Sequence, residues 1–82
     1  MKTVVLYGRD GCHVCDEARE QLLSLRTSGT AFSLEEIDIE SDDRLHRELL
    51  ERIPVIEVEG VRVSELLFDA DAIRAALATF EA

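Results

Sequence analysis

The chain has 82 residues and a formal net charge of −9. Hydrophobic residues make up 46% and charged residues 33% of it, which is typical of a small globular domain and excludes a disordered chain. No stretch approaches the roughly 20 apolar residues of a membrane span, and no basic stripe could neutralise the phosphates of a nucleic acid. We therefore expect a single domain over residues 1–82, monomeric and cytoplasmic, with no nucleic acid and no membrane as partner.

The N-terminal part predicts a strand, a turn and a helix. The apolar run at residues 3–7 is typical of a buried strand, and it is too short for the apolar region of a signal peptide. Residues 8–11 contain two glycines and predict a turn. A helix is expected to begin at Cys12 or His13 and to run to about Leu25. Its buried face follows from the spacing of Cys15, Ala18, Leu22 and Leu25.

The middle of the chain predicts a second strand and a second helix. Residues 32–39 are strand-like, but their alternation slips by one residue at Glu35–Glu36, so we expect a bulge there or a strand confined to the second half. The residues at 41–43 suit a helix N-terminus. Pro54 is expected to close the helix and to hold Ile53 extended. The apolar stripe of this helix would consist of Leu45, Leu49 and Ile53.

The C-terminal part predicts a hairpin and a last helix. Residues 55–58 and 61–63 flank Glu59–Gly60, a two-residue connection that suits a tight primed turn. Asp69 or Asp71 can cap the helix that follows, and its buried face would consist of Ile73, Leu77 and Phe80. The order β-α-β-α-β-β-α then predicts an α/β fold. A right-handed parallel βαβ unit and an antiparallel hairpin would form a four-stranded mixed sheet flanked by three helices.

The most informative feature is Cys12-His13-Val14-Cys15, which contains both cysteines of the chain. Two cysteines in a cytosolic chain argue against a structural disulfide framework, so the pair indicates either redox chemistry or half of a metal site. The junction of strand and helix favours redox chemistry. A helix N-terminus stabilises a thiolate at Cys12 and would lower its pKa from about 8.5 toward neutrality. Cys15 lies one helical turn on, within reach of a disulfide, and is expected to face inward.

Two neighbouring cations have a functional and a structural interpretation. Arg9 adds positive charge beside Cys12 if the turn folds back, or it is a solvated turn residue. The imidazolium of His13 stabilises the Cys12 thiolate and makes the protein more oxidising, or His13 is an exposed residue of the first helical turn. The redox potential of a His13→Ala variant separates these two interpretations of His13.

The chain resembles the glutaredoxin-like proteins of the thioredoxin-fold superfamily, and in particular a small bacterial glutaredoxin-like group. The resemblance covers nearly the whole chain and is carried, in order, by Tyr7, Arg9, Cys12-His13-Val14-Cys15, Ile37-Asp38-Ile39, Ile53-Pro54-Val55 and Gly60. The short length suits glutaredoxin better than thioredoxin, which has an additional strand and helix and usually a tryptophan before its motif; this chain has no tryptophan.

The resemblance implies a thiol–disulfide oxidoreductase in which Cys12 is the nucleophile and Cys15 the resolving thiol. It also implies that Pro54 is a cis-proline facing the motif, which would leave the backbone of Ile53 to pair with a bound peptide. Without the resemblance, Pro54 would be read as an ordinary trans-proline at the end of a helix, because only about 5–6% of X–Pro bonds are cis. The expected partners are a protein or small-molecule disulfide and a reducing thiol or reductase.

The chain departs from the usual glutaredoxin pattern in two places. His13-Val14 replaces the usual Pro-Tyr between the cysteines, and residues 62–69 lack the Gly pair that helps to hold glutathione. Glutathione, another low-molecular-weight thiol and a flavoprotein reductase all stay open as electron source. No tightly bound cofactor and no metal is expected.

Two other function classes stay open from the sequence. A metal-binding module would need ligands beyond Cys12 and Cys15, and only His13 and His46 are conventional candidates. A binding or adaptor domain could keep the fold without turnover, although such a domain needs neither thiol. Reduction of a disulfide by the chain and by a variant without Cys12 separates the adaptor from the enzyme.

Overall fold

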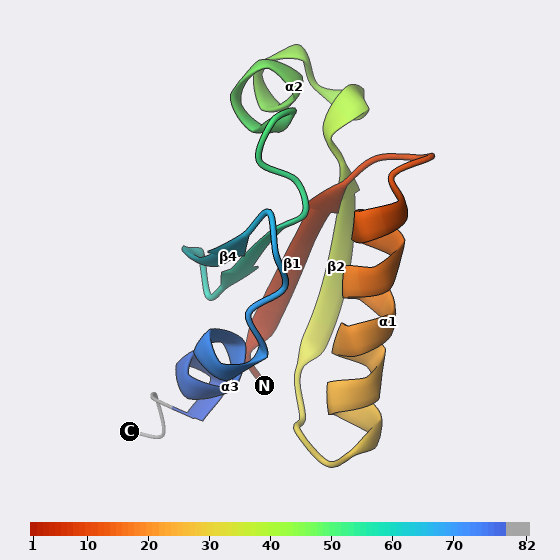
Figure 1. Cartoon of the computed structure of the whole chain (residues 1–82). Coiled ribbons are helices and arrows are strands. Elements are labelled where there is room, and N and C mark those ends of the chain that lie inside the picture. Colours follow the sequence, from red (N-terminus) through yellow and green to blue (C-terminus); the bar gives the residue numbers. More distant parts are fainter. Residues whose placement is uncertain (79–82) are drawn as a thin grey trace.

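The computed structural model describes residues 1–78 and contains an α/β fold with the predicted order of elements (Figure 1). The expectation for Phe80 lies outside the described residues. The elements are β1 (Thr3–Gly8), α1 (His13–Thr27), β2 (Ser33–Asp38), the 3₁₀ turn η1 (Ile39–Ser41), α2 (Asp43–Leu49), β3 (Val55–Val58), β4 (Val61–Glu65) and α3 (Ala70–Ala78).

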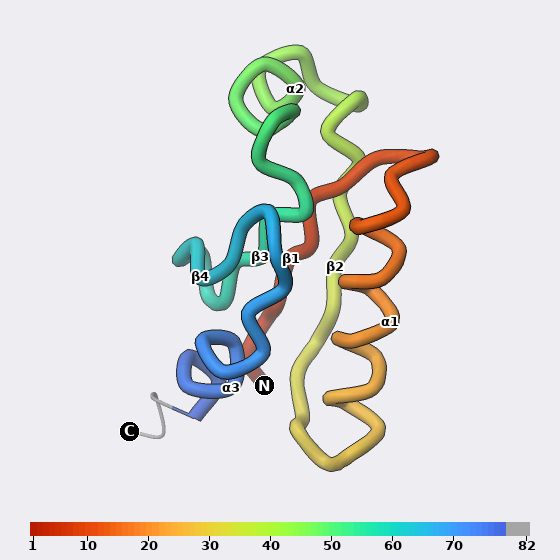
Figure 2. Tube along the Cα trace, viewed as in Figure 1, coloured from red at the N-terminus to blue at the C-terminus, as the bar shows by residue number. Residues whose placement is uncertain are grey.

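The sheet has the strand order β2-β1-β3-β4. β1 pairs in parallel with β2 and antiparallel with β3, and β3 pairs antiparallel with β4, so the predicted mixed sheet is confirmed. The chain trace shows how the crossover through α1 makes β1 and β2 neighbours (Figure 2). Because β1 is an inner strand, the residues that follow it leave the sheet near its middle.

The two faces of the sheet bury different clusters. Side chains alternate along a strand, so Leu6 and Ile56 face one side while Tyr7 and Val55 face the other. The larger cluster joins the first face to α1 and α3 through Val4, Leu6, Ala18, Leu22, Leu25, Phe32, Ile56, Val58, Ile73 and Leu77. The smaller cluster contains Ile39, Leu49 and Val55, with Tyr7, Leu45 and Ile53 packed against it. The helix α1 is therefore anchored to the sheet along its whole buried face.

The second strand differs from the prediction. β2 runs in unbroken register from Ser33 beside Thr3 to Asp38 beside Gly8, so the expected bulge at Glu35–Glu36 is wrong. The apolar residues Leu34 and Ile37 lie three apart and therefore on opposite faces of this edge strand. That spacing, rather than a bulge, explains the slipped alternation.

The second helix is shorter than predicted. α2 ends at Leu49, four residues before Ile53, so Ile53 is not part of a helical stripe. Ile53 nevertheless packs on the same cluster as Leu45 and Leu49, because the chain turns back through hydrogen bonds from Arg52 N and Ile53 N to Leu49 O. The expected cap is confirmed: Asp42 accepts from Arg44 N at 2.8 Å and from Leu45 N at 3.2 Å.

The hairpin is confirmed, and it contains a bulge that the pattern did not predict. Glu59 and Gly60 both have positive φ, 51° and 82°, as a primed two-residue turn requires. The register shifts between Ile56 and Glu57, which face Ser64 and Arg62, so β4 carries one additional residue and extends to Glu65. Asp69 then caps α3 by accepting from Ala72 N at 3.0 Å.

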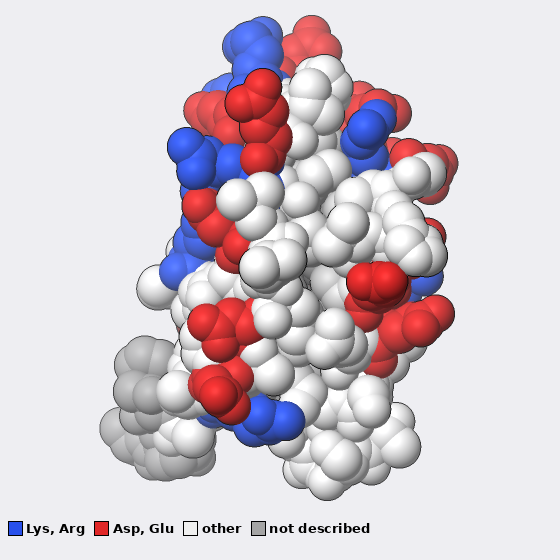
Figure 3. Space-filling view, in the orientation of Figure 1, with Lys and Arg blue, Asp and Glu red and all other residues white. Residues whose placement is uncertain are grey.

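The negative charge of the chain is spread over its surface. On the face shown in Figure 3, Asp and Glu side chains lie on both sides of a strip of uncharged surface. Within residues 1–78, no helix is long and apolar enough to cross a membrane.

Candidate active site

Cys12 occupies the N-cap of α1. Its backbone is extended, and its Sγ accepts a hydrogen bond from Cys15 N at 3.3 Å. A capping sulfur takes the place of the serine or aspartate oxygen that usually accepts from the first N–H groups of a helix. The same N–H group and the positive end of the helix stabilise negative charge on this sulfur after reduction. Cys12 is partly exposed, so it can meet a substrate.

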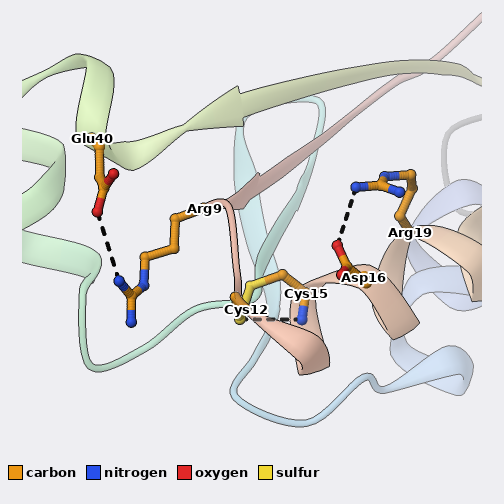
Figure 4. The surroundings of a disulfide bond; sticks show 6 residues. All are labelled: Arg9, Cys12, Cys15, Asp16, Arg19 and Glu40. Atoms are coloured by element: carbon orange, nitrogen blue, oxygen red, sulfur yellow. Dashed lines mark hydrogen bonds and ion pairs between the residues drawn. A yellow bond between two sulfur atoms is a disulfide. The ribbon is translucent and has the colours of Figure 1, made fainter.

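Cys15 forms a disulfide with Cys12, with their Cα atoms 5.2 Å apart, and it is 5% exposed (Figure 4). The expected contrast between an accessible first cysteine and a buried second one is confirmed. The Cys15 side chain packs on Gly8, the last residue of β1. The sequence pattern predicts that Gly8 belongs to the turn, whereas the structure places it at the end of β1, where the missing side chain leaves room for the Cys15 sulfur. Gly11, with φ of 80°, is the glycine that makes the turn.

Arg9 lies beside the motif, but its charge is shared with an acidic residue. Its Nη1 is 3.7 Å from Oε2 of Glu40, and both side chains are about half exposed. Figure 4 shows the guanidinium extended toward Glu40. The Arg9 carbonyl accepts from Cys12 N at 3.3 Å and so helps to place the first cysteine. Arg9 thus connects the active-site turn to η1.

His13 lies in the first turn of α1 and is almost fully exposed. Its Nε2 is 3.1 Å from Oε2 of Glu17, one helical turn further along. Any positive charge on the imidazole therefore has a carboxylate partner in addition to Cys12. This pairing weakens the field that His13 can exert on the sulfur.

Ile53 and Pro54 lie at the end of the sheet beside the motif. The Ile53–Pro54 peptide bond is cis, as the resemblance implied. Tyr7 pairs with Val55 in the antiparallel ladder, so the next residues along the two strands, Gly8 and Pro54, also lie side by side. Cys15 packs on this same Gly8. The N–H group of Ile53 donates to Leu49 O at 3.0 Å and is engaged within the chain. Backbone pairing with a substrate at Ile53 would therefore depend on its carbonyl group.

A cleft of about 290 Å³ lies on the α1 side of the motif and reaches Cys15. Arg19 lies in its wall and donates from Nε to Glu36 at 2.8 Å and from Nη2 to Asp16 at 3.3 Å. The hydrogen bond to Glu36 raises the pKa of Arg19 further, so this arginine keeps its charge. Four carboxylates and two arginines line the cleft: Asp10, Asp16, Glu36, Asp38, Arg9 and Arg19.

Metal-ligating side chains do not gather in the described part of the chain. Among residues 1–78, no three His, Cys, Asp or Glu side chains lie together as ligands. The interpretation of the cysteine pair as half of a metal site therefore gains no support from the fold. Two thiols at a helix start, one accessible and one buried, can instead perform thiol–disulfide exchange.

A family comparison decides what kind of protein this is. The model of the Glutaredoxin-like domain (DUF836) matches residues 3–78. The chain belongs to this glutaredoxin-like family. No curated protein matches the chain.

Solved structures agree with this assignment. The NMR structure of protein Ne2328 from Nitrosomonas europaea is 34% identical over 94% of this chain and 92% of its own length, with a TM-score of 0.82. The X-ray structure of target XcR50 from X. campestris is 35% identical over 90% of this chain and 93% of its own, with a TM-score of 0.73. Oxidised thioredoxin from Plasmodium falciparum is 16% identical over 99% of this chain and 82% of its own, with a TM-score of 0.62. The last likeness shows the thioredoxin fold alone.

Proposed function

We propose that this glutaredoxin-like protein is a thiol–disulfide oxidoreductase that works through Cys12 and Cys15. The observation that carries the proposal is the different placement of the two sulfurs. Cys12 is accessible and caps a helix, with Cys15 N donating to its Sγ, while Cys15 is buried directly behind it. An attacking thiol needs access and a stabilised thiolate, and a resolving thiol needs only proximity to the first sulfur.

The exchange transfers two electrons in two steps. The Cys12 thiolate attacks one sulfur of a substrate disulfide, a new S–S bond forms, and the other substrate sulfur leaves as a thiolate that takes up a proton. Cys15 then loses its proton and attacks the Cys12 sulfur, which restores the Cys12–Cys15 disulfide and releases the second substrate thiol. The substrate is reduced by two electrons and the protein is oxidised by two, with no bound cofactor involved.

Regeneration of the dithiol needs an external two-electron donor. Two molecules of a low-molecular-weight thiol such as glutathione, or a flavoprotein reductase, would supply those electrons. We place this cycle in the cytoplasm, where such donors keep thiols reduced. Run in reverse, the same chemistry oxidises a substrate dithiol, and the redox potentials of the two partners decide the direction.

Trapping tests the proposal. A Cys15→Ser variant lacks the resolving thiol, so it should accumulate mixed disulfides between Cys12 and its substrates, visible by mass spectrometry and reversed by dithiothreitol. The matched control is Cys12→Ser, which keeps one thiol but removes the nucleophile and should trap nothing. If both variants form adducts equally, or neither does, the assignment of Cys12 as nucleophile is wrong.

The rate of alkylation provides a second test that needs no substrate. In the reduced protein, Cys12 should react with iodoacetamide at neutral pH faster than an unperturbed thiol, because the capping N–H group stabilises its thiolate. Cys15 should react far more slowly because it is buried. Peptide mapping of the labelled protein measures both rates. Equal rates at the two cysteines would contradict the division of labour.

A further inference from the structure

The second step of the exchange requires a proton acceptor for Cys15. The resolving thiol attacks as a thiolate, so its proton must leave before the new S–S bond forms. Cys15 is 5% exposed, and burial disfavours a charged sulfur. During this step a substrate is bound to Cys12, on the accessible side of the motif. The proton of Cys15 therefore needs a route that leads away from that side.

The cleft on the α1 side of the motif provides such a route. Cys15 and Asp38 both lie in its wall. Its volume of about 290 Å³ leaves room for water, since one water molecule needs about 10–15 Å³ of such space. A proton from Cys15 can therefore reach a carboxylate of the cleft through water. The charged side chains that line the cleft come from the turn after β1, from α1 and from β2: Arg9, Asp10, Asp16, Arg19, Glu36 and Asp38.

The strand register places Asp38 beside the position on which Cys15 packs. Gly8 and Asp38 are paired at the ends of the parallel strands β1 and β2. Leu34, four residues before Asp38, packs on the cluster that contains the buried face of α1, so both side chains are on the α1 side of the sheet. The Cys15 sulfur is 3.1 Å from the place that a Cβ atom of Gly8 would take. Because neighbouring strands lie about 4.8 Å apart, the Asp38 side chain begins about one strand spacing from this contact, a gap that one water molecule can bridge.

The other carboxylates of the cleft are less suitable. Arg19 donates to Glu36 at 2.8 Å and to Asp16 at 3.3 Å, so both are bound to a cation, and Figure 4 shows Asp16 turned toward Arg19. Asp10 lies in the turn, past the end of β1. Asp38 instead accepts at Oδ1 from a backbone N–H group of η1 at 2.8 Å. This hydrogen bond fixes the Asp38 carboxylate in place, and its second oxygen, Oδ2, can accept a proton.

We propose, on the basis of the oxidoreductase function proposed for this chain, that Asp38 is the proton acceptor for Cys15 in the second step. The Cys15 S–H proton passes through a water molecule in the cleft to the Asp38 carboxylate. The Cys15 thiolate attacks the Cys12 sulfur and their S–S bond forms, while the bond from Cys12 to the substrate sulfur breaks and leaves its electron pair on the substrate. The substrate thiolate takes a proton from solvent, and Asp38, which is exposed, releases its own proton to solvent.

An Asp38→Asn variant separates proton transfer from the effect of charge. Asparagine keeps an oxygen that can accept from the N–H group of η1, so the variant should fold. If Asp38 acted on Cys15 only through its negative charge, the loss of that charge would favour the Cys15 thiolate and make the second step faster. If Asp38 accepts the proton, the second step should become slower at pH 7, on the order of 100-fold. This loss should shrink above about pH 9, where a thiol ionises without a base.

Release of thionitrobenzoate measures both steps in one experiment. The reduced protein is mixed rapidly with dithiobis(nitrobenzoate), so that attack by Cys12 releases one yellow thiolate and attack by Cys15 releases a second. Asp38→Asn should keep the first release and slow the second, and imidazole, a small base that can enter the cleft, should restore part of the lost rate. Glu36→Gln is the matched control, because it removes one carboxylate from the same cleft and should not slow the second release. Asp38→Ser, which also keeps a capping oxygen without a carboxylate, should behave like Asp38→Asn.

The outcomes are distinguishable. A second release that is unchanged or faster in Asp38→Asn would overturn the role of Asp38, and so would an equal loss in Glu36→Gln, because the charge of the cleft would then be the cause. Equal slowing of both releases would overturn it as well, since Asp38 would then support only the fold of the site. If Asp38→Asn does not fold, Asp38→Ser gives the same measurement. No release of thionitrobenzoate from the native chain would instead contradict the oxidoreductase function.

Discussion

Gly8 and Cys15 are in contact so close that even a methyl group at position 8 would press on the cysteine side chain. A Cβ atom there would lie 3.0 Å from the Cys15 Cβ and 3.1 Å from its Sγ, whereas non-bonded carbon atoms prefer 3.5–4.0 Å. Gly8 has no positive φ, so its role is to provide space and not conformational freedom. The end of β1 thereby sets the depth at which the second cysteine lies.

Replacement of Gly8 by alanine should disturb Cys15 selectively. The methyl group would displace the Cys15 sulfur by a few tenths of an ångström and lower the free energy of unfolding by about 1–3 kcal/mol. We expect the second step of exchange, attack by Cys15, to slow by about tenfold, since a small misplacement of reacting atoms is costly. The first step at Cys12 should keep its rate, because the added methyl group would contact only Cys15. Rapid-mixing kinetics with a small disulfide separate the two steps.

A double-mutant cycle provides the control for Gly8→Ala. In a Cys15→Ala background the sulfur is absent, so the loss of stability caused by Gly8→Ala should shrink. Chemical denaturation of the four proteins under reducing conditions measures the coupling. An unchanged loss of stability in the Cys15→Ala background would mean that the contact with the sulfur is not the cause.

Removal of the charge on Glu17, the partner of His13, should change the redox potential of the dithiol. Glu17→Gln removes a carboxylate from the start of α1 and leaves His13 without this partner, 3.1 Å away in the native chain. Loss of the carboxylate removes negative charge near Cys12, which favours its thiolate and hence the reduced form, so the potential should rise by about 5–20 mV, as expected for exposed charges. His13→Ala should change it less. Equilibration with glutathione buffers measures the potential, and a lower potential for Glu17→Gln would contradict the electrostatic argument.

Tyr7 offers a pH-dependent signal, because the chain contains one tyrosine and no tryptophan. Burial, and then the carboxylate of Glu57, which accepts from the phenol at 3.3 Å, raise the pKa of Tyr7 above 10.0. The absorbance of the ionised phenol should therefore appear above pH 10 in the folded protein. Glu57→Gln should move the midpoint back toward 10.0 without reaching it, since burial is the larger cause. A midpoint that Glu57→Gln leaves unchanged would remove Glu57 as a cause.

The same pKa shift has a consequence for stability. The folded state holds the Tyr7 proton more tightly than the unfolded state, so the associated stabilisation is complete below pH 10 and declines as the pH rises above it. Tyr7→Phe does not titrate. The difference in unfolding free energy between the native chain and Tyr7→Phe should therefore stay constant below pH 10. Above pH 10, the unfolding free energy of the native chain should fall relative to that of Tyr7→Phe. Denaturation of the two oxidised proteins across this range tests the sign.

The cap of α2 should contribute measurably to stability. Asp42 Oδ1 accepts from both Arg44 N and Leu45 N, and α2 is only seven residues long. Asp42→Ala should lower the free energy of unfolding by about 1 kcal/mol. Asp43→Ala, one residue further along, is the matched control and should cost less, because Asp43 acts only through the charge of the first turn. Equal losses for the two variants would contradict the capping role.

Local sequence patterns predicted the structure well where it depends only on residues close together in the chain. The N-terminus of α1, the primed turn at Glu59–Gly60 and the caps at Asp42 and Asp69 all follow from chemistry within a few residues. The wrong predictions concern β2 and the end of α2, where packing between distant segments decides the conformation. β2 is an edge strand whose Leu34 and Ile37 face opposite sides, and Ile53 leaves α2 while keeping its place in the cluster.

The sequence by itself determined the chemistry of this protein: two thiols, three residues apart, at the start of a helix. Their spacing and the helix N-terminus act locally, so no distant residue is needed to predict them. Only the tertiary structure decided the surroundings of the thiols. The close contact of Gly8 with Cys15, the pairing of Arg9 with Glu40 and the position of Leu66 beside Pro54 each join residues of different elements. Such contacts depend on strand order and register, which a local pattern does not contain.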